Sequence, residues 1–170
     1  MFRSAKFSLL LVCFSLSAQA AAAAEPPADP RAALQAATAQ ARQQAHTLRG
    51  VAMAERKRCA ALRKNDLHPC TPALADAIAA VEAAARGLDE LADRVADRAA
   101  GASDPAATLQ RAKCSGGDAD ACSAVRQADV TLDGYRRMFA EPAAERLRQD
   151  AAAALQSLER ARGDHRSAGG

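Results

Sequence analysis

Apolar residues recur at steps of three and four along most of the chain after residue 30, which is the period of an amphipathic α-helix. The clearest stretch follows Thr71-Pro72, which suit a helix N-cap and first turn, and ends at Gly101. Its apolar positions are Leu74, Ile78, Val81, Ala85, Leu88, Leu91, Ala92, Val95 and Ala99. Since no stretch alternates with period two, the pattern predicts an all-α protein.

The same period predicts a long helix before this one, from Arg31 to about Lys64, with Asp29 as its cap and Pro30 at its first position. Gly50 lies in the middle of that helix, where we expect a bend. Residues 65–69 have turn composition. The expected seam is Leu34, Ala37, Ala41, Ala45, Leu48, Val51 or Ala52, Cys59 and Leu62.

Three shorter helices are predicted after Gly101. The first opens at Asp104-Pro105 and runs to about Lys113, before a glycine break. The next is capped by Asp118 or Asp120 and carries the seam Val125, Ala128, Leu132, Tyr135 and Phe139. Pro142 is expected to break or kink the chain before a last helix over 143–162, with a disordered tail over 163–170. The prediction is one domain over 31–162, an elongated antiparallel hairpin or bundle of about four to five helices.

The first 20 residues have the three-part pattern of a secretory signal peptide. Arg3 and Lys6 precede an apolar run over residues 7–17, and Ala18-Gln19-Ala20 supplies the small residues of a cleavage site. The apolar run is shorter than the roughly 20 residues that a membrane anchor needs. We expect cleavage after Ala20, or as late as Ala24, then a flexible leader over 21–30, and a periplasmic or secreted protein without a transmembrane anchor.

Charge and aromatic content argue against nucleic acid as a partner. The chain has 23 Lys and Arg against 20 Asp and Glu, and without Arg3 and Lys6 the counts are 21 against 20. Tyr135 and Phe139 are the only aromatic residues after residue 20, whereas single-stranded nucleic acids are bound on several stacking side chains.

Four cysteines follow the signal: Cys59, Cys70, Cys114 and Cys122. In an exported domain this number predicts two disulfides. We favour Cys59–Cys70 and Cys114–Cys122, because each pair flanks a helix reversal, while crossed pairings stay an alternative. The segment Cys114-Ser-Gly-Gly-Asp-Ala-Asp-Ala-Cys122 also resembles the C-x7-C hairpin of disulfide-bonded tetratricopeptide-like repeats.

That resemblance covers about a dozen residues and supports a local Cys114–Cys122 bridge rather than family membership. The Leu-Gly and Tyr positions that follow in the family are not matched, since Ala124-Val125-Arg126 stands there, and no second copy is present. A second, shorter run is similar to exported lysozyme-inhibitor-like domains, and it consists of Cys122, Asp129, Leu132 and Tyr135. The terminal Trp, Arg and Cys of those domains have no counterpart in this chain.

Two charged clusters are candidate partner-binding sites. Asp89, Asp93 and Asp97 stack at steps of four, either as a solvated face or as a surface for a cation or a basic partner. At the end of the first long helix a basic group either complements the helix dipole and meets acids of the next helix, or binds an anion or a membrane surface. Its members are Arg56, Lys57, Arg58, Arg63 and Lys64.

The chain carries no recognisable catalytic signature, and no cofactor is expected. The leading hypothesis is a non-catalytic exported protein that binds another envelope or secreted protein, as an inhibitor, immunity protein, adaptor or complex subunit. The alternative is a metal-binding protein that holds zinc or copper(I) with Cys59, His68 and Cys70, near Met53.

Overall fold

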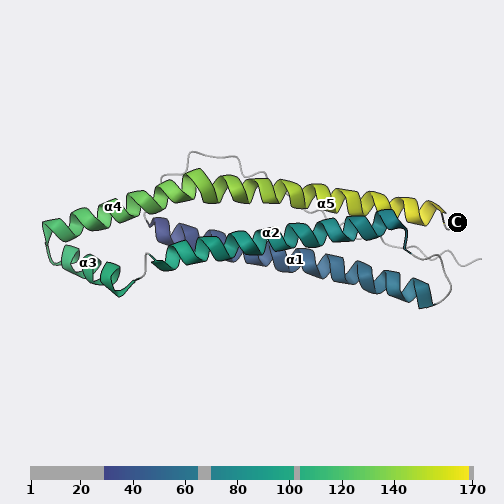
Figure 1. Cartoon of the computed structure of the whole chain (residues 1–170), viewed down its shortest axis with the longest axis horizontal. Coiled ribbons are helices and arrows are strands. Elements are labelled where there is room, and N and C mark those ends of the chain that lie inside the picture. Colours follow the sequence, from purple (N-terminus) through teal and green to yellow (C-terminus); the bar gives the residue numbers. More distant parts are fainter. Residues whose placement is uncertain (1–28, 65–69, 102–103, 169–170) are drawn as a thin grey trace, which may run out of the picture.

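The computed structural model describes residues 29–64, 70–101 and 104–168. Its helices are α1 (Pro30–Lys64), α2 (Pro72–Gly101), α3 (Pro105–Ser115), α4 (Ala119–Tyr135), a π-helical turn over Arg136–Ala140 and α5 (Glu141–Ala168). The described residues contain no strand, so the predicted all-α class is confirmed. Helices α1, α2 and α5 run side by side along the molecule, and α3 with α4 extends beyond one end of them (Figure 1).

Helices α1 and α2 begin at the N-terminal caps that the sequence predicted. The Asp29 carboxylate accepts a hydrogen bond from the Arg31 N–H at 2.9 Å, and Pro30 occupies the first turn. Thr71 accepts the Leu74 N–H with both its hydroxyl and its carbonyl oxygen. These caps satisfy N–H groups that have no partner within the helix. Helix α1 continues through Gly50 without interruption.

Helix α2 is the centre of the core because it packs against α1 on one side and α5 on the other. Its buried residues include every position of the predicted seam, with Ala77 and Ala84 in addition. Two clusters share the core: one joins α1, α2 and α5 along most of their length, and the second lies near the π-helical turn. Leu147 packs against both clusters, so the core is continuous along the bundle.

The buried side of α1 contains two polar residues that a search for apolar positions misses. Thr38 and Glu55 are 7% and 2% exposed. Thr38 lies seven residues before the buried Ala45, and Glu55 lies seven residues after the buried Leu48. Ala37, which the predicted seam included, is exposed. The Thr38 hydroxyl donates to the Leu34 carbonyl at 2.9 Å. Glu55 accepts hydrogen bonds from Arg58 and from Arg162 of α5. A buried charge is tolerated only when it is paired in this way.

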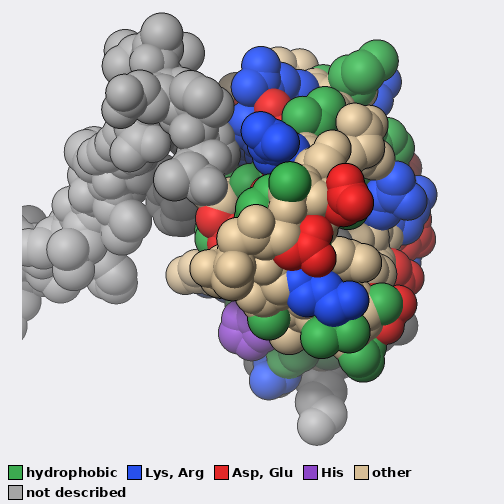
Figure 2. All heavy atoms as spheres, turned by 90° about the vertical axis from the view of Figure 1, so that its left-hand side faces the viewer, with side chains coloured by type: hydrophobic (Ala, Val, Ile, Leu, Met, Phe, Trp, Pro, Cys, Tyr) green, Lys and Arg blue, Asp and Glu red, His purple; other side chains and the backbone are tan. Residues whose placement is uncertain are grey.

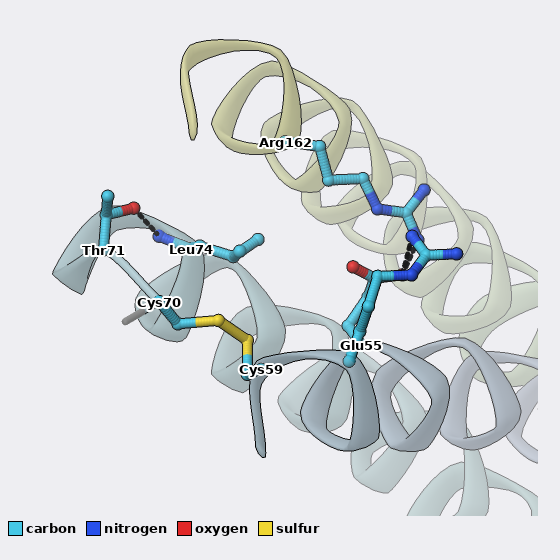
Figure 3. Close-up of a disulfide and its surroundings, with 7 residues drawn as sticks. Glu55, Cys59, Cys70, Thr71, Leu74 and Arg162 are labelled. Atoms are coloured by element: carbon cyan, nitrogen blue, oxygen red, sulfur yellow. Dashed lines mark hydrogen bonds and ion pairs between the residues drawn. A yellow bond between two sulfur atoms is a disulfide. The ribbon is translucent and has the colours of Figure 1, made fainter. Parts of the chain in front are cut away.

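Two local disulfides close the helix reversals, as predicted. Cys59–Cys70 joins the end of α1 to the residue before Thr71, and Cys114–Cys122 joins the end of α3 to the first turn of α4. The first bridge lies beside the Glu55–Arg162 pair, so a covalent link and an ion pair together tie α1, α2 and α5 at this end (Figure 3).

The α3–α4 hairpin turns at the glycine pair that the sequence marked as a break. Gly117 has φ of +92°, a backbone conformation that favours glycine. Asp118 then caps α4 by accepting the Ala121 N–H at 3.0 Å. Helix α3 has no buried residue, and α4 buries only Ala121 and Leu132. The hairpin is therefore held mainly by its own contacts, including a 2.9 Å ion pair between Arg111 and Asp129.

Of the break or kink expected at Pro142, the break is wrong, because α4, the π-helical turn and α5 form one continuous helix (Figure 1). Pro142 has no N–H for a bond to the carbonyl four residues earlier, and its ring would clash with that carbonyl in a regular α-helix. The turn widens directly before it, where the Glu141 N–H bonds to the Arg136 carbonyl five residues back. One π-helical turn thus accommodates Pro142 without interrupting the helix.

The expected disordered tail over 163–170 is also wrong for most of its length, since α5 continues to Ala168. Leu158 and Ala161 are buried against the bundle immediately before Gly163. Their packing anchors the last turns, and the Ser167 hydroxyl donates to the Gly163 carbonyl at 3.0 Å. Residues 1–28, which include the expected signal peptide and most of the leader, lie outside the described residues.

Replacing Glu55 with Gln tests the buried ion pair. The amide cannot supply the charge that Arg58 and Arg162 face, so we expect the free energy of unfolding to fall by about 1–3 kcal/mol in urea denaturation. Glu159, which is exposed on α5, is the matched control, and Glu159→Gln should change stability by less than about 0.5 kcal/mol. Equal stability of both variants would contradict a structural role for Glu55.

Two glycine substitutions test how closely α2 and α5 approach. A Cβ on Gly50 meets nothing within 4 Å, so Gly50→Ala should stabilise the protein by about 0.5–1 kcal/mol through helix propensity alone. A Cβ on Gly87 would lie 2.8 Å from Leu147 Cδ2 of α5, so Leu147 must move. Gly87→Ala should therefore yield a smaller gain or a loss. Equal melting-temperature gains for both variants would contradict the close approach.

Candidate functional site

Two arginines of the basic group at the end of α1 form ion pairs within the molecule. Arg56 donates two hydrogen bonds to Glu82 of α2, at 2.6 and 2.7 Å, and this carboxylate holds the pKa of Arg56 above its ordinary value. Arg58 pairs with Glu55 at 3.0 Å, and Lys57 is exposed. The side chains of Arg63 and Lys64 lie outside the described residues. Of the three members whose side chains are described, two are therefore held by carboxylates of the molecule itself.

The aspartate stack on α2 forms part of an ion-pair ladder between α1 and α2. Arg42 pairs with Asp93 at 3.1 Å, and Arg49 pairs with Asp89. Arg42, Arg49 and Arg56 follow one another at intervals of seven residues, so all three meet α2 along one edge of the hairpin. Asp97 is exposed and has no ion pair among the described residues. Two of the three aspartates thus serve the packing of α1 against α2.

The metal hypothesis loses two of its ligands to a disulfide. Cys59 and Cys70 are bonded to each other, and a disulfide sulfur is not a thiolate ligand. His68 lies outside the described residues, and Met53 is exposed on α1. Among the residues that the structure describes, no group of three or more His, Cys, Asp or Glu could hold a metal ion.

A shallow groove of about 380 Å³ lies between the first turns of α1 and the last turns of α2. Its lining is Gln35, Thr38, Ala39, Arg42, Ala96, Ala99 and Ala100. None of these side chains is a carboxylate, imidazole or thiol, and Arg42 is engaged with Asp93. The groove therefore lacks a nucleophile paired with a base, the arrangement that covalent catalysis requires.

A cluster that the sequence did not single out lies where the α3–α4 hairpin joins the bundle. The rings of Tyr135 and Phe139 stack with their centroids 5.1 Å apart. From α2, the Arg94 guanidinium lies 5.8 Å from the Phe139 centroid, and that of Arg98 lies 5.6 Å from the Tyr135 centroid. Arg94 and Arg98, four residues apart on α2, thus cover two rings that are also four residues apart on the continuous helix of α4, the π-helical turn and α5. We call these four residues the aromatic–arginine cluster.

The π-helical turn carries a second group of charges beside this cluster. Arg136 is 15% exposed and bonds to Asp133 at 2.8 Å and to Glu141. Its hydrogen bond holds the pKa of Asp133 below the ordinary value, and the same contact raises the pKa of Arg136. Arg137 also pairs with Asp133, at 2.8 Å. The carboxylates of Asp133 and Glu141, which flank the turn, therefore neutralise Arg136 and Arg137. Arg94 and Arg98 contact the aromatic rings instead.

Apolar side chains are exposed around this junction and on the hairpin. Met138 is 85% exposed, Phe139 is 36% exposed, and Val130 of α4 and Leu109 of α3 are 66% and 56% exposed. Figure 2 looks at the molecule from the hairpin end and shows hydrophobic side chains on this surface between charged ones. Four of the five large apolar residues exposed among the described ones thus belong to the hairpin and the π-helical turn.

Comparisons with protein-family models, with curated proteins and with solved structures found no match for this chain. In the described part of the chain, no helix is both long enough and apolar enough to cross a membrane.

The tyrosine titration tests the geometry of the cluster, because Tyr135 is the single tyrosine and the chain has no Trp. Burial raises the pKa of Tyr135 above 10.0, while the charges of Arg94 and Arg98 lower it. Phenolate absorbance should therefore appear at higher pH in the native protein than in urea. The protonated phenol is favoured by folding, so its contribution to stability is present below about pH 10 and is lost as pH rises through the folded pKa.

Removing the two cations should move the same titration further upward. Arg94→Gln combined with Arg98→Gln is expected to raise the Tyr135 pKa, and Arg86→Gln, at an exposed arginine on the same helix, is the control. A downward shift in the double variant, or an equal shift in the control, would contradict the contact between the guanidinium groups and the ring.

Proposed function

We propose that this protein is exported through its N-terminal signal and acts in the periplasm or outside the cell by binding another protein, without catalysing a reaction. The observation that carries the proposal is the projecting α3–α4 hairpin. Helix α3 buries no residue, yet the hairpin is closed by a disulfide and exposes Leu109 and Val130. Exposed apolar side chains on a disulfide-closed projection are typical of a protein-binding surface.

Export is supported by the disulfides and by the pattern of the first 20 residues. Disulfides such as Cys59–Cys70 and Cys114–Cys122 persist in oxidising compartments. The signal-peptide pattern at residues 1–20 provides a route to such a compartment.

Site-specific photocrosslinking in the cell that encodes the protein tests the binding surface. A photoreactive residue at Val130, on the hairpin, should form a covalent adduct of one reproducible mass. The same residue at Gln156, which is exposed on α5, should not, because that helix face is polar and distant from the hairpin.

The same cells supply the export control. The intact mass of the recovered chain should match cleavage after Ala20 or Ala24 with all four thiols oxidised. No adduct at Val130 from correctly exported protein would overturn the proposed function, and an uncleaved or reduced chain would overturn the proposed location. An equally strong adduct from Gln156 would count against the hairpin as the binding surface.

A further inference from the structure

The aromatic–arginine cluster concentrates the residue types that dominate the energy of protein interfaces. Interface cores are enriched in Tyr, Phe, Met and Arg, and single Tyr and Arg residues often carry much of the binding energy. Here both aromatic residues found after residue 20 lie together, under two arginines and beside Met138. Tyr135 packs against the second core cluster, whereas the neighbouring Phe139 is 36% exposed, so the aromatic pair lies at the edge of the core and reaches the surface.

Arg94 and Arg98 differ from the arginines of the α1–α2 ladder in what they contact. Arg42, Arg49 and Arg56 each pair with a carboxylate. Arg94 and Arg98 are exposed, lie over ring faces, and pair with no carboxylate among the described residues. Stacking uses the flat face of a guanidinium and limits its motion, while the N–H groups at its edge stay able to donate. The two groups are therefore pre-oriented donors.

We infer that Arg94 and Arg98, with the exposed Phe139 and Met138, bind an acidic segment of a partner protein in which Asp or Glu lies next to apolar residues. The guanidinium edges of Arg94 and Arg98 donate to the carboxylates of that segment. Its apolar residues cover the Phe139 ring edge and Met138. The inference rests on the proposed function and names the chemistry of the partner and where it docks.

An anionic membrane surface is the other ligand that arginines and exposed apolar residues could attract, and the local charges disfavour it. Lipid-binding patches gather about four to eight basic residues whose field acts at long range. At this junction Asp133 and Glu141 pair with Arg136 and Arg137. Arg94 and Arg98 pair with no carboxylate among the described residues, which suits contact with individual carboxylates at short range.

Methionine-methyl NMR on the exported, disulfide-bonded chain tests the inference. After signal cleavage the chain has two methionines, Met53 on α1 and Met138 at the site. The probe is a short synthetic peptide rich in Glu and Leu. It should shift the Met138 methyl signal in a saturable way and leave that of Met53 unchanged. A peptide with Gln in place of every Glu should bind at least roughly tenfold more weakly, because its charge-assisted hydrogen bonds are lost.

Matched variants assign the binding to the two arginines. Arg94→Gln with Arg98→Gln should weaken peptide binding about tenfold or more, while Arg86→Gln should leave it unchanged. Helical circular dichroism of each variant confirms that it is folded. Equal weakening by Arg86→Gln would mean diffuse charge attraction and would overturn the inference. So would a Met138 shift with phosphatidylglycerol vesicles and none with the peptide, or no shift with either probe.

The failure of this inference is distinguishable from failure of the proposed function. A photocrosslinked partner at Val130 together with no peptide binding at Met138 would leave the function in place and remove the acidic-segment assignment. No crosslinked partner at all would remove the proposed function itself.

Discussion

The packing of α2 between α1 and α5 is the constraint on which the rest of the structure depends. Its buried side is built largely from alanines and single leucines or valines, including Ala77, Ala84 and Ala85. Small side chains let helices approach closely, and at Gly87 the approach leaves no room for a Cβ beside Leu147. Each alanine buries little apolar area, so the stability of this core comes from its length. A repetitive alanine seam also discriminates weakly between registers.

Charged residues supply that discrimination. Arg42, Arg49 and Arg56 fix α1 against α2 through their carboxylate partners, and Glu55 fixes α1 against α5 through Arg162. Exposed pairs of this kind add little stability individually. A register shifted by one heptad would bring other arginines of the same seven-residue spacing to these carboxylates, so the ladder alone does not exclude it. The same shift would leave Glu55 buried without Arg162, which is costly. The Cys59–Cys70 bridge acts with them at one end of the bundle.

The π-helical turn makes the projecting hairpin part of the bundle. Because the helix does not break at Pro142, α4 continues directly into α5, and Leu132 and Ala140 join the second core cluster. The hairpin is therefore joined to the bundle by an uninterrupted helix. The same turn brings Tyr135 and Phe139 under Arg94 and Arg98, so the geometry that accommodates a proline also assembles the surface to which we assign partner binding.

The sequence alone determined what depends on neighbours along the chain. The seam of α2, the caps at Asp29 and Thr71 and the glycine turn before Asp118 follow from periodicity, capping chemistry and spacing over a few residues. The all-α class follows for the same reason. The sequence favoured the two local disulfides but left crossed pairings open, and the structure decided between them. Tertiary structure decided where the polar and aromatic side chains went. Glu55 occupies an apolar heptad position, and only its partner Arg162, 107 residues away, makes that burial tolerable.

The sequence likewise determined only part of the candidate site, and the tertiary structure determined the rest. The aspartates and the basic residues stood out as charge runs, yet their partners across the α1–α2 interface could not be identified until the register of two long helices was known. Arg94 with Arg98 and Tyr135 with Phe139 show a spacing of four in the sequence, which was the available signal. Which side chains of α2 the two rings meet depends on how the continuous helix packs along α2, and the sequence did not give that packing, because local rules for proline allow a kink or a break at Pro142.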